Sequence, residues 1–212
     1  MFFILQWIFI ALMIRIFLIV LISLVPGLSH GQYKWKLERN QDGIKIYSAD
    51  VPNSVFKAVR VECTFTGTYT KLISILSNVS QFNKWVYHTK TSRLLKKNSP
   101  HDFVYYTETE LPWPMSNRDA VVHMRFNTDS LPKCLIITGT GETGWVALKS
   151  GLERVSHYKA KWRVTMPTAQ TIHIDYEFEL DPSGNIPAWV TNITNDKGPF
   201  ETFSNLAKKL KE

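Results

Sequence analysis

The sequence predicts an α+β fold in which a curved antiparallel β-sheet wraps around a long C-terminal α-helix. Apolar and polar residues alternate in one segment after another between residues 34 and 182, which is typical of strands with one buried face. Apolar residues then recur at helical spacing between residues 187 and 211. No linker or repeat divides this region. The C-terminal helix is therefore the element expected to cover the apolar face of the sheet.

Residues 1–31 have the features of a targeting segment. The chain is therefore predicted to consist of this segment and a domain of residues 32–212. Residues 2–28 are almost wholly apolar, and small residues precede Gln32, which suits an export signal cleaved before that residue. The alternative is an uncleaved membrane anchor, because about 20 apolar residues suffice to span a bilayer. We expect the cleaved signal. Either interpretation places the domain outside the cytoplasm, in the periplasm or secreted.

The domain begins with three predicted strands and continues with short helices. Residues 34–39, 43–49 and 55–65 alternate in polarity, and the pair Asp42-Gly43 is a tight-turn signal between the first two. The period then changes from two to about 3.6 residues, which predicts one or two short helices between strands 3 and 4. The residues at helical spacing, all between Thr68 and Trp85, are Leu72, Ile75, Leu76 and Val79.

Six further strands are predicted as three consecutive pairs, and the tail supplies the long helix. In the last strand, five apolar residues from Ile172 to Leu180 alternate with polar ones, so this strand has one buried face. Pro199 interrupts the C-terminal stripe and should kink or split the helix near Gly198. The predicted strand pairs are 89–98 with 102–112, 118–126 with 133–141, and 157–167 with 170–182.

Composition and motif content argue against several classes of function. The net charge of +7 is spread along the chain without a basic stripe or a nucleic-acid-binding motif. The histidines of the domain lie in different segments without metal-ligand spacing, and no catalytic or phosphate-binding motif occurs. Cys63 and Cys134 lie in strand-like segments, where we expect two small buried hydrophobic residues. We expect no metal, no cofactor and no enzymatic activity.

The passage from Glu110 to His123 contains a rigid corner. Two prolines flank Trp113 and cannot donate backbone hydrogen bonds, so a sheet cannot continue through them. The spacing of Ser116 and Asp119 would suit a helix cap, but the alternation that follows favours a strand. Arg118 and Asp119 then point to opposite faces. The inward one needs a partner, because an unpaired buried charge is costly, and Glu108 and Glu110 are the nearest carboxylates.

Three passages in the right order resemble the StAR-related lipid-transfer (START) domain family. "LPWPMSNRDAVV" is similar to the P-x-P-x-S-x-R-D-x-V passage of the family. "KSGLERVSHYKAKWRV" resembles its G-x-V-R-V segment and the strand that follows, and "ELDPSGNIPAWVTN" resembles its link into the C-terminal helix. The resemblance covers about residues 33–210. It implies a helix-grip fold with a hydrophobic tunnel that holds one lipid, a phospholipid or a sterol, without cofactor or catalysis.

The resemblance also implies candidate ligand-binding residues. A tunnel carboxylate falls on Glu108 or Glu110, and the charged corner adds Arg118. The inward arginine of the family falls on Met124 here, while Arg125 and His123 point to the other face. A gate loop beside the front half of the C-terminal helix falls on "NTDSLPK", with Leu131 as its apolar tip. The candidate tunnel walls are Trp162, Tyr176, Phe178, Trp189, Ile193, Phe200 and Phe203.

Three hypotheses on function follow from these features. The first is a monomeric lipid-binding or lipid-transfer module that holds a phospholipid or sterol-like lipid and touches membrane surfaces transiently. The second is a helix-grip enzyme of the polyketide cyclase type, in which Glu110, His123 and Arg125 act on a bound apolar substrate. The third is an interaction domain with a filled core, tethered by residues 2–28.

Overall fold

The computed structural model of the chain describes residues 33–54, 56–155, 157–181 and 196–212. Contacts divide the chain into two compact units, Met1–Gln32 and Tyr33–Glu212. The second unit has its own sheet, helices and core, so it is the part expected to fold alone. The predicted export signal or anchor lies outside the described residues. Within the described ranges, none of the helices combines the length and the apolar character that crossing a membrane requires.

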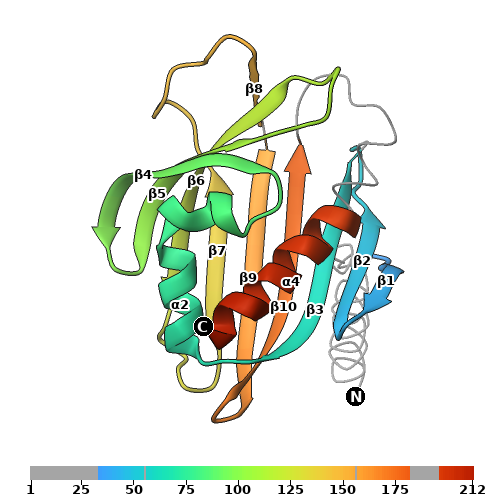
Figure 1. Ribbon diagram of the computed structural model, residues 1–212, viewed down its shortest axis with the longest axis vertical. Helices are drawn as coiled ribbons and strands as arrows, with labels where there is room; N and C mark the ends of the chain where they lie inside the picture. The colour runs from blue at the N-terminus through green and yellow to red at the C-terminus, as the bar shows by residue number, and fades with distance from the viewer. Residues whose placement is uncertain (1–32, 55, 156, 182–195) are drawn as a thin grey trace, which may run out of the picture. The chain divides into compact units, whose positions relative to one another are not determined.

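The sheet is antiparallel, apart from one short parallel strand (Figure 1). Its order is β1-β2-β3-β10-β9-β7-β6-β5-β4, with β8 beside the start of β6. The first three strands therefore join the last one through the antiparallel pair of β3 and β10. The bounds are β1 (Lys36–Gln41), β2 (Ile44–Asp50), β3 (Lys57–Thr66), β4 (Thr89–Ser99), β5 (Asp102–Thr109), β6 (Asn117–Asn127), β7 (Leu135–Gly141), β8 (Leu152–Arg154), β9 (His157–Thr168) and β10 (Thr171–Asp181).

The helices of the described residues lie on the concave face of the sheet, as Figure 1 shows for α2 and α4. The helix α2 (Tyr69–Ser77) begins at Thr68, whose Oγ1 accepts a hydrogen bond of 3.2 Å from the backbone N–H of Lys71. The 3₁₀-helix η1 (Val79–Lys84) follows it directly. The C-terminal helix α4 (Gly198–Lys211) has a proline in its first turn, where the missing N–H costs nothing. The predicted helical residues from 187 to 195 lie outside the described ranges.

The predicted fold class is confirmed, including the short helices between strands 3 and 4. One core fills the concave side, and α4 contributes Phe203, Leu206 and Leu210 to it. A smaller apolar cluster on the convex side contains Val104, Tyr106 and Val121. The two clusters use alternate residues of the same strands, because successive side chains of a strand point to opposite faces.

The proline-rich corner connects β5 to β6, as predicted, and no helix starts there. The strand that the alternation favoured over a helix cap at Ser116 and Asp119 is confirmed, because β6 begins at Asn117. The Asn117 Oδ1 accepts a 3.1 Å hydrogen bond from the backbone N–H of Leu111, which closes the corner. The only strand that the sequence analysis missed among the described residues is β8. Its three residues are too few to show a period.

Candidate functional site

An aromatic cluster lies on the concave face beneath α4. The ring of Tyr176 on β10 lies 4.5 Å from that of Trp162 on β9 and 5.4 Å from that of Phe203 on α4, between centroids. Phe178 stacks on Tyr176 at 5.8 Å. The structure therefore brings together four of the predicted tunnel walls. It does so because residues 162, 176 and 178 are inward positions of two neighbouring strands.

Beside this cluster, two small residues adjoin each other on neighbouring strands. Gly139 on β7 and Ala160 on β9 are cross-strand neighbours, and Phe178 is the next neighbour of Ala160 on β10. The ring of Tyr158 covers Gly139 so closely that an added Cβ would come within 3.2 Å of it. The side-chain layer is therefore thinner at Ala160 than at its aromatic neighbours.

Three tyrosine hydroxyls meet on this face. The Tyr158 oxygen accepts hydrogen bonds from the hydroxyls of Tyr105 and Tyr176, which come from β5 and β10. Burial raises the pKa of all three phenols, above all those of Tyr105 and Tyr176. They therefore stay protonated at neutral pH, and because Tyr105 and Tyr176 donate to Tyr158, the Tyr158 hydroxyl is the donor left for a ligand. This group was missed from the sequence, because it joins positions up to 71 residues apart (176 − 105).

Two members of the site combine an inward position with residual exposure. Tyr176 and Phe178 are only partly buried, although Tyr176 contacts Trp162 and Phe203, which are 7% and 1% exposed. Aromatic faces together with a few hydroxyls suit a ligand that is mostly apolar and has some polar atoms.

The charged pair of the corner divides between the two faces, as predicted, but its partners differ from the expected ones. Arg118 is 4% exposed on the inner face and forms a 3.2 Å ion pair with Glu153 of β8. Asp119, on the outer face, forms an ion pair with Arg154, which belongs to β8 as Glu153 does. It also accepts a 3.0 Å hydrogen bond from Tyr106. The predicted partners, Glu108 and Glu110, were inferred from nearness along the chain. The parallel pairing of β6 with β8 supplies Glu153 and Arg154 instead.

The structure places Glu108, His123 and Arg125 away from the aromatic cluster and corrects the face expected for Glu108. All three belong to the alternating positions that face the convex side, as do Val104 and Tyr106 of β5 and Val121 of β6. They are therefore separated from the aromatic cluster by the sheet itself. The sequence analysis had already placed Arg125 and His123 opposite to the family's inward arginine, and the same alternation applies to Glu108.

These outer residues fasten the segment 142–151 to the back of the sheet. His123 is 8% exposed, and its ring nitrogens lie 2.8 Å from Asp102 and 2.7 Å from Glu142. The hydrogen bond from His123 lowers the pKa of Asp102, while those from Trp145 and then His123 lower the pKa of Glu142. A second anchor joins Lys149 to Glu108, whose pKa that hydrogen bond lowers.

We expect His123→Ala to destabilise the protein by about 1–2 kcal/mol near neutral pH and by less in acid. Both carboxylates have a pKa that is lower in the folded than in the unfolded state. Their contribution is therefore complete above about pH 4–5 and is lost as the pH falls through the folded values. Urea unfolding of both proteins at several pH values measures the difference. His173→Ala is the control, since His173 binds Thr64 instead. A difference that grows in acid contradicts the prediction.

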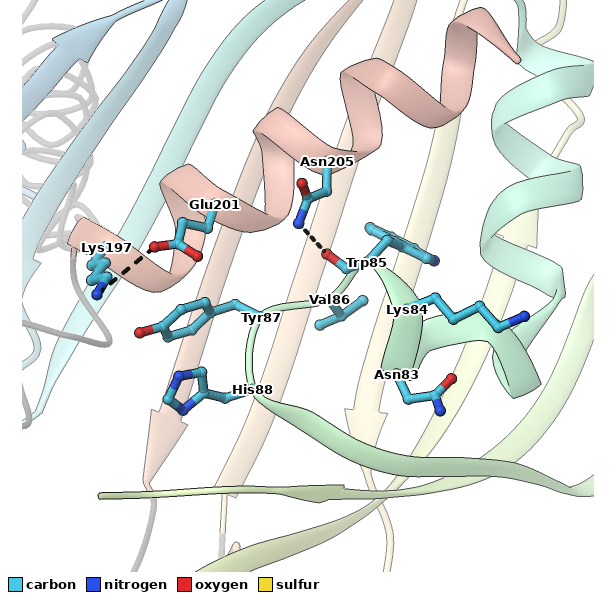
Figure 2. A pocket seen from close by; sticks show the side chains of 9 residues that line it. All are labelled: Asn83, Lys84, Trp85, Val86, Tyr87, His88, Lys197, Glu201 and Asn205. Carbon is cyan, nitrogen blue, oxygen red and sulfur yellow. Dashed lines mark hydrogen bonds and ion pairs between the residues drawn. The ribbon is translucent and has the colours of Figure 1, made fainter. Parts of the chain in front are cut away.

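A polar groove lies where the chain enters β4, beside the first turns of α4 (Figure 2). It has a volume of about 360 Å³. Two hydrogen bonds hold its walls together: Asn205 Nδ2 donates to the Trp85 carbonyl at 3.1 Å, and the backbone N–H of Tyr87 donates to Thr202 Oγ1 at 3.1 Å. The lining residues are Asn83, Lys84, Trp85, Val86, Tyr87, His88, Lys197, Glu201 and Asn205. Nothing in the sequence pointed to this groove, because its walls are distant along the chain.

The remaining predicted site residues lie apart from the aromatic cluster or outside the described ranges. Glu110 is solvent-exposed at the end of β5, 3.9 Å from Lys90. Leu131 is 36% exposed in the loop between β6 and β7. Phe200 is partly buried in the first turn of α4, with the guanidinium of Arg39 4.6 Å from its ring centre. Trp189 and Ile193 lie outside the described residues.

The loop that carries Leu131 lies near the last turn of α4 rather than its first turns. The Tyr69 hydroxyl, at the start of α2, donates a 3.2 Å hydrogen bond to the carbonyl of Pro132 in this loop. The neighbouring Gly67 lies against Leu210, since a Cβ on Gly67 would come within 3.1 Å of that side chain. The resemblance had placed a gate beside the front half of the C-terminal helix. The described contacts place this loop at the opposite end of α4.

Curated relatives of this chain include lipid-transfer proteins. An uncharacterised protein of Pseudomonas aeruginosa is 25% identical over 173 residues, which cover 81% of this chain and 84% of that protein. The phosphatidylcholine transfer protein of Bos taurus is 26% identical over 179 residues, which cover 82% of this chain and 83% of that protein.

Solved structures share the fold. A STAR-related lipid transfer protein from Xanthomonas axonopodis superposes with a TM-score of 0.76 at 26% identity, over 84% of this chain and 99% of that one. A Streptomyces aromatase/cyclase has a TM-score of 0.50 at 9% identity, over 72% and 90%, a likeness that extends to the fold alone. The family pattern of the START domain matches residues 25–212. With its antiparallel sheet, its C-terminal helix and the three passages quoted above, this chain belongs to the START domain family.

Proposed function

We propose that this protein binds one lipid between the concave face of the sheet and α4, and that it transfers this lipid between membranes. The observation that carries the proposal is the concave face around Ala160. Gly139 and Ala160 carry little side-chain volume there, the rings of Trp162 and Tyr176 offer apolar walls, and the Tyr158 hydroxyl offers a hydrogen bond. The acyl chains would lie against the rings, and the polar atoms of the lipid would face the hydroxyls.

A phospholipid is the ligand that we favour. The Bos taurus relative is a phosphatidylcholine transfer protein and matches over 82% of this chain. Glycerophospholipids carry ester and phosphate oxygens, which accept hydrogen bonds, and protonated phenols are suitable donors. We further propose that the domain acts outside the cytoplasm, on the basis of the apolar residues 2–28, and that it acts as a monomer.

The residues of the enzymatic alternative do not converge on this site. His123 and Arg125 lie on the convex face, and Glu110 is exposed at the end of β5. A general acid or base must come within hydrogen-bond reach of the reacting group. A substrate bound beside the aromatic cluster would be separated from His123 and Arg125 by the sheet. This set of residues therefore gives the cyclase hypothesis no support.

The lipid itself tests the proposal. A chain of residues 33–212, purified without added lipid, is expected to show one bound phospholipid per protein molecule by native mass spectrometry, and lipid extraction then identifies it. The same protein should move labelled phosphatidylcholine from donor to acceptor vesicles. An empty protein that neither takes up phosphatidylcholine nor accelerates its transfer would refute the proposal and favour an interaction domain with a filled core.

A further inference from the structure

Two large apolar side chains protrude into solvent from separate loops. Trp113, in the corner between β5 and β6, is 91% exposed, and Leu148, in the segment before β8, is 77% exposed. Neither takes part in the aromatic cluster or in the anchors of the outer face. Full exposure of a tryptophan is unusual in a folded domain, because its large ring gains most from burial.

Both side chains belong to the same end of the sheet. β6 and β8 run parallel and in register, with Asn117 opposite Leu152. Trp113 precedes Asn117 by four residues, and Leu148 precedes Leu152 by four. Loops that lead into parallel, in-register strands enter from the same edge. Figure 1 shows the two connections at its upper end.

The tips of these loops carry no ionic groups. Residues 111–117 and 143–148 contain no Asp, Glu, Lys or Arg. Moving them out of water therefore involves no desolvation of charge, which is the largest cost of entering an apolar medium. An indole has an apolar body and one N–H donor, so it suits the boundary between headgroups and acyl chains.

The corner also presents Trp113 in a fixed way. Prolines on both sides restrict the backbone. Two hydrogen bonds close the loop, from the Leu111 N–H to Asn117 and from the Met115 N–H to the Pro112 carbonyl at 3.0 Å. A side chain held out in this way loses little backbone freedom when it binds.

We propose that the loops 111–117 and 143–148 form a bilayer-docking surface, which inserts Trp113 and Leu148 into the interfacial layer of a membrane. Two protruding tips suit a deformable bilayer better than a protein partner, whose stable interface needs about 800 Å² of complementary surface on each side. The insertion is apolar and requires no anionic lipid.

This docking surface lies next to the polar groove. The Glu110 N–H, just before the corner, donates a 2.8 Å hydrogen bond to the carbonyl of His88, which lines that groove. Docking through Trp113 therefore brings the groove and the first turns of α4 to the membrane. The loop of Leu131, which lies by the last turn of α4, would face away from this contact.

Flotation of residues 33–212 with phosphatidylcholine vesicles tests the inference. We expect Trp113→Ala to weaken the partition coefficient about tenfold and Leu148→Ala about threefold, from the apolar area that each withdraws. Trp113→Phe should retain much of the binding. Leu131→Ala is the matched control, since it removes an exposed leucine from the other loop, and it should bind as the wild type does. Because both target residues are exposed, the variants should unfold at the wild-type urea concentration.

Several results would overturn the docking surface. These are absence of wild-type binding to phosphatidylcholine vesicles, an unchanged partition of Trp113→Ala, or an equal loss for Leu131→Ala. Binding that disappears at about 0.5 M salt would show an electrostatic contact instead. Lipid occupancy, measured by native mass spectrometry, separates this inference from the proposed function. A wild-type protein without bound lipid that docks through Trp113 would refute the proposed lipid binding and support the docking surface. A protein with bound lipid that does not dock would support lipid binding and refute the docking surface.

Discussion

Asp119→Ala is expected to lower the free energy of unfolding by about 3–5 kcal/mol, because it leaves a buried charge without its partner. The side chain of Asp119 is 1% exposed, and it accepts hydrogen bonds from Arg154, which is 14% exposed, and from Tyr106. Alanine would leave the guanidinium facing an apolar methyl group, while the Tyr106 hydroxyl keeps its 2.8 Å hydrogen bond to Glu108. Urea unfolding followed by tryptophan fluorescence measures the loss.

The exposed pair of Lys90 and Glu110 provides the control. Their side chains are 54% and 55% exposed and lie 3.9 Å apart, so Lys90→Ala should change stability by less than about 0.5 kcal/mol. Asp119→Asn keeps the shape and a hydrogen-bond acceptor, and it should fall between the two. If Asp119→Ala lowers the free energy of unfolding by no more than Lys90→Ala does, the ion pair of Asp119 and Arg154 does not stabilise the junction of β6 and β8.

Ala160→Phe is expected to abolish lipid occupancy while leaving a folded protein. Ala160 lies between Gly139 and Phe178 of the neighbouring strands. If Ala160 borders a ligand space, a phenyl ring at this position occupies the place of the acyl chains at little cost in stability. In a filled core, the same ring would overpack the layer and destabilise the protein by about 1–3 kcal/mol or more. Native mass spectrometry and urea unfolding of one sample separate these outcomes.

Two further variants complete this test. Lys161→Phe adds the same ring at the next residue, which is exposed on the convex face, and it should leave lipid occupancy unchanged. Ala160→Leu adds a smaller group, so it should reduce occupancy in part and retain a fold even if the phenyl variant loses it. Wild-type occupancy in both Ala160 variants, or a loss of occupancy in Lys161→Phe, would place the lipid elsewhere.

Much of the fold could be predicted because its signals are local. The alternation of Ile172, Ile174 and Tyr176 is visible within a few residues, and the structure confirms the strand and its inward face. The change of period near Leu72 likewise marked the helices between β3 and β4. The same alternation correctly indicated that Arg118 and Asp119 face opposite sides.

The partners of these residues could not be predicted in the same way. Glu108 and Glu110 were the nearest carboxylates along the chain, yet Arg118 pairs with Glu153, 35 residues away (153 − 118). That pairing depends on β8, which is too short to have a pattern of its own. The family resemblance assigned a tunnel carboxylate to Glu108 on β5. The strand is correct, but the side chain of Glu108 points to the convex side of the sheet.

By itself, the sequence determined the order of the elements other than β8, the alternation of faces along the longer strands, and membership of the family through three ordered passages. These properties follow from periodicity, backbone restriction at proline and spacing, all of which act over a few residues. The tertiary structure alone decided the joined hydroxyls of Tyr105, Tyr158 and Tyr176, the groove beside α4, and the placement of the loops of Trp113 and Leu148 at one end. Each of these depends on which distant strands become neighbours and in which register, and burial of the whole core selects that arrangement.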